Sequence, residues 1–252
     1  MGHCRICNGE KKLIKAHAIP QAFFLPLRDG ENPPIPVSEG HYPKRIPIGA
    51  YDSEILCEEC EGRFSSVDDY GVRVLLTDFS KLFAPIAFAG YGYASTSVDC
   101  QKLLLFLVAV LLRASFSRQR FYSKVELGPL EERAIEAIAN PGRAVPTCFD
   151  AVLSRWRTAS NAKFTTPVVM DPRPERWSGV RAYRLYLGAM VAYVKTDTRP
   201  FPNDLEDLSL QRGGELRFPT RNFETSKDFR AMSNTAKRAH RRKPSLRNRS
   251  SK

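Results

Sequence analysis

Four of the six cysteines in this 252-residue chain form two C-x-x-C pairs, Cys4/Cys7 and Cys57/Cys60. A structural zinc ion is bound by four protein ligands in tetrahedral geometry, with no coordination position left open. Two thiolate pairs flanking a compact segment supply these four ligands. A single pair can equally be a redox couple, so it is the second pair that favours a metal. We therefore expect one structural Zn²⁺ bound by Cys4, Cys7, Cys57 and Cys60.

The segments around these cysteines must bring the two pairs together. A tight turn at Gly9 follows the first pair, and the polar/apolar alternation of residues 11–15 predicts a short strand that ends at His17. Residues 26–47 contain six prolines and predict a surface loop, after which residues 48–56 form a second strand into the second cysteine pair. From Glu58 onward, apolar residues recur at helical spacing. A zinc knuckle at Cys4 and Cys7, then a hairpin, then a helix is the order of a treble clef. The sequence therefore predicts a treble-clef, or ββα, zinc unit.

Two runs carry a resemblance to a known family. Residues 15–23 (KAHAIPQAF) resemble the D/H/S-H-I-I/V-P-x-x-F strand end of the HNH (ββα-metal) endonucleases, and residues 56–61 (LCEECE) resemble their L-C-x-x-C-H helix start. The similarity is to the Cys4-zinc branch, including HNH-like proteins of bacteria and phages, and covers about residues 1–75.

The resemblance implies metal-dependent hydrolysis of phosphodiester bonds. By motif position His17 is the general base, and a separate Mg²⁺ or Mn²⁺ would stabilise the developing negative charge. The sequence departs from the family at three positions: Ala16 replaces a metal-binding Asp or His, Glu61 replaces a His, and Gly62 replaces an Asn. A carboxylate suits Mg²⁺ or Mn²⁺, so Glu61 is the expected ligand, with Asp52 as the second.

Other interpretations stay open at this point. His17 can be a histidine that hydrogen-bonds within the zinc fold, and Asp68 and Asp69 are interpreted as exposed helix charges. The leading hypothesis is an HNH-type endonuclease. The alternative is a non-catalytic, zinc-stabilised nucleic-acid-binding or scaffold protein with a degraded site, and a redox or metal-sensing protein is the third class.

The positive charge gathers at the C-terminal end. Of the net charge of +12, residues 221–252 contribute +9, with eleven Lys/Arg and two acids. A basic tail on a nearly balanced body indicates a polyanionic partner, and we expect nucleic acid, with DNA ahead of RNA. The expected phosphate contacts are Arg63, Arg238, Arg241, Arg242 and Lys243. The low hydrophobicity of this tail predicts disorder until it binds.

The rest of the chain predicts an α+β protein with three parts: the zinc unit at 1–75, an associated α+β domain at 76–220 and the tail at 221–252. Helices are expected at 100–117 and 130–139, followed by a small antiparallel sheet with a hairpin near Gly188. The domain shows no second active site, and it can recruit a protein partner.

The longest apolar run, residues 103–112, is too short to cross a bilayer and predicts a core helix. Few cysteines and the lack of a leader before Cys4 favour a reducing, cytoplasmic setting.

Overall fold

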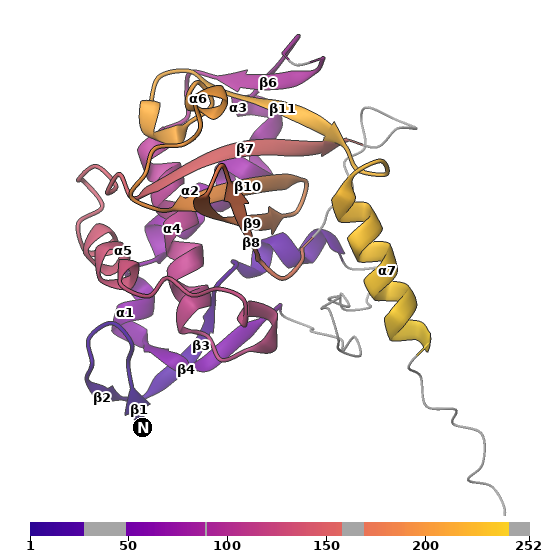
Figure 1. The fold of residues 1–252 in the computed structure, drawn as a ribbon. Helices are drawn as coiled ribbons and strands as arrows, with labels where there is room; N and C mark the ends of the chain where they lie inside the picture. The colour runs from indigo at the N-terminus through magenta and orange to yellow at the C-terminus, as the bar shows by residue number, and fades with distance from the viewer. Residues whose placement is uncertain (28–48, 89, 158–168, 242–252) are drawn as a thin grey trace, which may run out of the picture.

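The computed structural model describes residues 1–27, 49–88, 90–157 and 169–241, and these form a mixed α+β protein (Figure 1). The proline-rich loop expected at 26–47 lies mostly outside the described residues. Two small antiparallel hairpins open the chain, β1 with β2 and β3 with β4. Their bounds are β1 Gly2–His3, β2 Glu10–Lys11, β3 Leu13–His17 and β4 Tyr51–Cys57, with the 3₁₀ segment η1 at Gln21–Leu27.

A series of short helices follows directly from β4. They are α1 Glu58–Gly62, α2 Ser65–Val72, the π-helical turn η2 Arg73–Thr77 and α3 Phe79–Leu82. The predicted apolar face is confirmed, because its side chains are all buried: Cys60, Phe64, Val67 and Leu75 at 0–2% exposed, and Gly71 beside them. Between α1 and α2 the helix is interrupted at residues 63–64, where the backbone amides bond three residues back.

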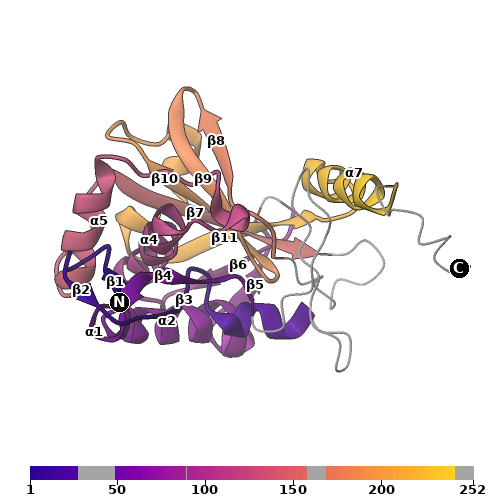
Figure 2. The same ribbon diagram turned by 90° about the horizontal axis from the view of Figure 1, so that it is seen from below.

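Helix α4, Cys100–Phe116, lies between two layers of the molecule. Figure 2 shows it between the sheet and the layer formed by α1, α2, β3 and β4. Asp99 caps its first turn by accepting a 2.9 Å hydrogen bond from the Lys102 amide. Gly71 of α2 meets α4 so closely that a Cβ there would lie 2.3 Å from the Phe106 ring. The expected buried core helix is therefore confirmed.

Two further elements follow α4: the 3₁₀ segment η3, Arg120–Tyr122, and helix α5, Leu130–Ala139. Helix α5 has the predicted bounds. None of the helices within the described ranges is both long and apolar enough to span a membrane.

The sheet is larger than expected and is mixed rather than antiparallel. Seven strands run in the order β5-β6-β11-β7-β10-β9-β8, and β11 pairs with β7 in parallel while the other neighbours are antiparallel. The predicted hairpin turn at Gly188 is confirmed, with φ +67° between β9 and β10. The strands are β5 Ala84–Ile86, β6 Gly92–Ser95, β7 Phe149–Arg157, β8 Arg173–Trp177, β9 Val180–Leu187, β10 Met190–Thr196 and β11 Leu216–Asn222, and α6 Asn203–Glu206 and η4 Leu210–Arg212 precede β11.

One continuous core crosses the expected boundary near residue 75. Buried side chains of the zinc unit, of α4 and of one sheet face belong to a single cluster, from Cys4 through Phe64 and Phe106 to Phe218. A second cluster, around Trp156 and Tyr186, covers the opposite sheet face. The zinc unit is thus packed against the α+β part along the length of α4.

The expected disordered tail at 221–252 differs from the structure over residues 221–241. Residues 221–222 finish β11, and Lys227–Arg241 form helix α7, which projects from the body in Figures 1 and 2. The physical reason is Asp228, which is 3% exposed and accepts bonds from Arg184, Arg221 and the Tyr186 hydroxyl. Residues 242–252 lie outside the described residues.

Candidate metal centre and its surroundings

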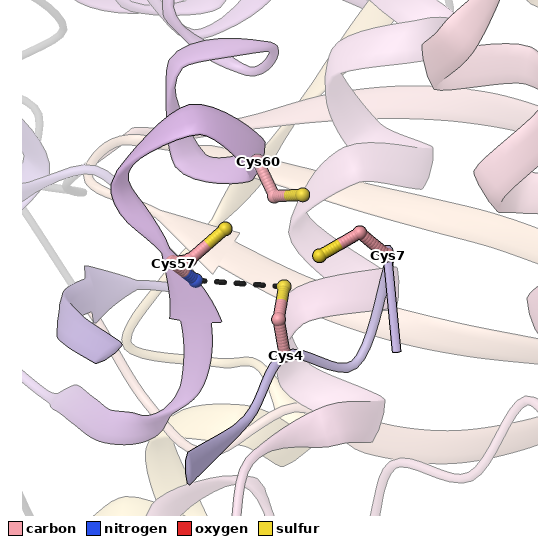
Figure 3. A group of neighbouring side chains, drawn as sticks. All are labelled: Cys4, Cys7, Cys57 and Cys60. Carbon is pink, nitrogen blue, oxygen red and sulfur yellow. Dashed lines mark hydrogen bonds between the residues drawn. The ribbon is translucent and has the colours of Figure 1, made fainter. Parts of the chain in front are cut away.

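The four cysteines come from two turns that the hairpins bring together. Cys4 and Cys7 lie between β1 and β2, Cys57 ends β4, and Cys60 lies in α1. Their Sγ atoms point toward one centre (Figure 3) and all lie within 4.8 Å of one another. Four Zn–S bonds of about 2.3 Å in tetrahedral geometry place the sulfurs about 3.8 Å apart. The prediction that these four cysteines form one group able to hold a metal ion is confirmed.

The first turn is closed by backbone bonds around Cys4. Its amide donates to the Gly9 carbonyl at 3.0 Å, and its carbonyl accepts from the Asn8 amide at 2.9 Å. Asn8 has φ +54°, a left-handed conformation that Asn tolerates better than most residues. Gly9, which was expected to permit the turn, has no positive φ. Asn8 is therefore the residue on which the turn depends.

The surroundings act in opposite directions on Cys4 and Cys60, and those of Cys4 favour a negative sulfur atom. The Cys57 amide lies 3.5 Å from Cys4 Sγ (Figure 3). Burial on its own would raise the pKa of Cys4, but backbone amides of Cys7, Cys57 and Ile6 lower this pKa to about 6. Burial, followed by hydrogen bonds with the other three sulfurs, raises the pKa of Cys60.

Three of these sulfurs lie in the interior. Cys4, Cys57 and Cys60 are at most 2% exposed, whereas Cys7 is exposed. Burying thiolates without a cation is costly, and a bound cation supplies the compensating charge and displaces the protons. The donor set, its spacing and its amide contacts all fit a four-thiolate metal ion such as zinc.

His17 lies at the end of β3, at the opposite end of the hairpin ladder from Cys57. It pairs with Tyr51 across the strands, and their rings are 5.8 Å apart and tilted by 55°. The Lys15 ammonium lies 5.2 Å from the same Tyr51 ring. His17 is half-buried, and it ends the strand as expected.

Asp52 does not present open carboxylate oxygens. It is 3% exposed, and one oxygen accepts from the Glu54 amide. The other accepts from the Ser117 hydroxyl and the Arg118 amide, both at 2.9 Å. Asp52 therefore ties β4 to the end of α4, and this explains its burial without a metal. Its neighbour across the ladder is Ala16, which is buried.

Glu61 and Asp68 share a buried cation, the Arg113 guanidinium of α4, which is 1% exposed. Asp68 accepts two bonds of 2.6 Å from it, and Glu61 Oε1 lies 3.8 Å from Nη1. The guanidinium also lies 4.5 Å from the Phe64 ring centroid. The interpretation of Asp68 as an exposed charge is therefore wrong.

Glu61 keeps one unused oxygen, because buried Oε2 has no hydrogen-bond partner. Burial raises the pKa of Glu61, and the Arg113 charge opposes this shift. The expected role of Glu61 as a metal ligand stays a prediction, and its neighbouring cation in the structure is Arg113.

The expected phosphate contacts are spread over two regions. Arg63 is exposed beside α1 and forms a 3.5 Å ion pair with Glu59. Arg238 and Arg241 lie in α7, and Arg242 and Lys243 lie outside the described residues. Three further α7 cations have exposed side chains and were not singled out from the sequence: Lys227, Arg230 and Lys237. Their spacing of three and seven residues was the available signal.

Within the described ranges, the four cysteines are the one group of three or more His, Cys, Asp or Glu side chains placed to hold a metal. A scan against models of protein families gave no match, and searches of curated proteins and of solved structures gave none either.

Proposed function

We propose that this chain is a nucleic-acid-binding protein in which a zinc ion stabilises an N-terminal treble-clef unit and the basic C-terminal region contacts the phosphate backbone. DNA is the proposed partner ahead of RNA. Zinc on four thiolates calls for reduced cysteines, which goes with a cytoplasmic setting. A protein partner for residues 76–220 stays a prediction.

Helix α7 is the observation that carries this proposal. Lys227, Arg230 and Lys237 are exposed, and helical geometry at 100° per residue puts all three within about 80° of one another around the axis. The helix projects from the body in Figures 1 and 2, and because these three side chains are exposed, a polyanion can reach them. Such a cationic stripe neutralises phosphates and releases their counterions on binding.

Charge reversal on this stripe tests the proposal. The variant Lys227→Glu/Arg230→Glu/Lys237→Glu should bind a fluorescein-labelled duplex at least tenfold more weakly by anisotropy and show a shallower dependence of log K on log salt. A matched variant reverses three exposed arginines elsewhere, Arg133, Arg143 and Arg176. Equal losses in both variants would mean that only net charge matters, and no binding by the parent protein would end the proposal.

An HNH-type endonuclease is the second candidate, and the position of His17 favours it. This half-buried histidine ends the strand of the same hairpin that carries the second cysteine pair. In this version His17 takes a proton from water, and Mg²⁺ or Mn²⁺ would supply Lewis-acid stabilisation. The candidate ranks second because Glu61 faces the Arg113 guanidinium, and because both Asp52 oxygens already accept hydrogen bonds from Glu54, Ser117 and Arg118.

Nicking of supercoiled plasmid with Mg²⁺ or Mn²⁺ separates the two functions. An endonuclease should lose at least a hundredfold in rate in His17→Ala while keeping duplex affinity. The matched control is His3→Ala, an exposed histidine in β1. If the parent protein binds duplex but nicks no plasmid with either ion, the endonuclease is ruled out and only the binding function stands.

A further inference from the structure

Strand β7 ends with two arginines on one sheet face. Arg155 and Arg157 alternate with Trp156, so they share the face of Leu153, which packs in the main core. Arg155 is half-buried, with its guanidinium carbon 3.7 Å from the Phe79 ring centroid. Arg157 is exposed at the strand end. One cation is thus held rigidly against an aromatic ring and the second stands beside it.

Neither arginine has a carboxylate partner among the described residues, in contrast to Arg113, Arg184 and Arg221. Arg113 is paired with Asp68 and Glu61, and Arg184 and Arg221 are paired with Asp228. Arg155 donates to the Met190 thioether at 3.5 Å and lies 5.9 Å from the Tyr93 ring centroid, and its buried Nε has no partner. Burial lowers the pKa of Arg155, and its interaction with Tyr93 opposes this shift.

A half-buried guanidinium without an anion is unfavourable, because the desolvation cost is not offset. A fixed guanidinium with free N–H donors is also the group best suited to phosphate, which it binds through two parallel bonds. Its stacking on Phe79 pre-orders the side chain, so less conformational entropy is lost on binding.

This pair also lies on the same side of the sheet as the segment that follows His17. Met190 is the cross-strand partner of Arg155, and Gly188 of the same hairpin approaches the Phe23 ring of η1 to within 3.9 Å of an added Cβ.

We propose that Arg155 and Arg157 form a phosphate-binding pair at the C-terminal end of β7 that contacts the nucleic-acid backbone independently of the basic C-terminal region. The ligand class is a phosphodiester or another phosphate group. The inference rests on the proposed function for its biological ligand, and free pyrophosphate tests the site separately.

The first experiment measures duplex binding against salt by anisotropy. Arg155→Met keeps the stacking volume and removes the charge, and Arg157→Ala removes the second cation. Each lost phosphate contact should reduce the slope of log K against log salt by about 0.9, so the double variant should lose about 1.8. The matched double variant Arg143→Ala/Arg176→Ala removes the same charge from exposed sites on a loop and on β8. Equal slopes in the two double variants would overturn the inference.

The second experiment uses pyrophosphate and thermal unfolding. The parent and Arg143→Ala/Arg176→Ala should both gain melting temperature with pyrophosphate, whereas Arg155→Met/Arg157→Ala should not. If pyrophosphate raises the melting temperature in this way but the parent protein binds no nucleic acid, the phosphate-binding pair is supported and the proposed function is rejected. No gain in the parent would reject the pair. Arg157→Ala alone, at an exposed site, gives the same test if substitution of Arg155 prevents folding.

Discussion

Asp68→Asn should strongly destabilise the protein although the residue lies on a helix surface. The substitution removes the charge that holds Arg113 through two 2.6 Å bonds, and the guanidinium is only 1% exposed. It would keep one weaker partner, Glu61 at 3.8 Å. Breaking a buried ion pair costs about 3–5 kcal/mol. Because the Asp68 side chain is 19% exposed and Glu61 remains, we expect about 3 kcal/mol.

Urea unfolding followed by circular dichroism measures this loss as a lower midpoint with an unchanged slope. Asp69→Asn is the matched control, since the neighbouring Asp69 is exposed on the same helix. It should change the unfolding free energy by less than about 0.5 kcal/mol. If the two variants unfold at the same midpoint, the reasoning about the buried cation is refuted.

Three more predictions follow from the core and the metal centre. Gly71→Ala should lower the unfolding free energy by about 2 kcal/mol in urea titrations, because the added Cβ would lie 2.3 Å from the Phe106 ring. The control Gly62→Ala has open space around it and should be neutral or stabilising. Cys7→Ser changes an exposed residue, yet it should abolish stoichiometric zinc by elemental analysis and lower the melting temperature; wild-type behaviour would contradict a metal ligand. Burial raises the pKa of Asp150, so its proton is held more tightly in the folded state. The stability of the parent relative to Asp150→Asn should therefore fall as the pH rises through the unfolded value of 3.8 and then the folded one, and a rise instead would contradict that shift.

Local patterns were enough to predict the parts whose partners are close in sequence or fixed by chemistry. The cysteine spacing predicted a group that geometry confirms, because thiolate pairs have few alternative uses. The apolar run of α4, the bounds of α5 and the turn at Gly188 follow from periodicity and from breaker residues.

The sheet could not be predicted in the same way. Strand β11 pairs with β7 in parallel and with β6 in the antiparallel direction, and both partners are remote in sequence. Strand propensity reports a half-buried surface and does not identify the neighbouring strand. Prediction from local sequence patterns therefore found the β9–β10 hairpin and underestimated the number of strands in the sheet.

Two charged residues account for the remaining differences. Acidic side chains are mostly exposed, so the residue type led to the wrong prediction for Asp68, whose partner Arg113 lies 45 residues away. Composition likewise predicted disorder after residue 220. Asp228, one of two acids in that basic stretch, is buried against Arg184 and Tyr186 and anchors α7.

X-ray absorption at the zinc edge of the purified protein tests the central claim most directly. Four thiolates on one ion predict a single shell of four sulfurs at about 2.3 Å and about one zinc per chain. A shell containing nitrogen or oxygen, or a protein that folds fully without any metal, would contradict a zinc ion bound by Cys4, Cys7, Cys57 and Cys60.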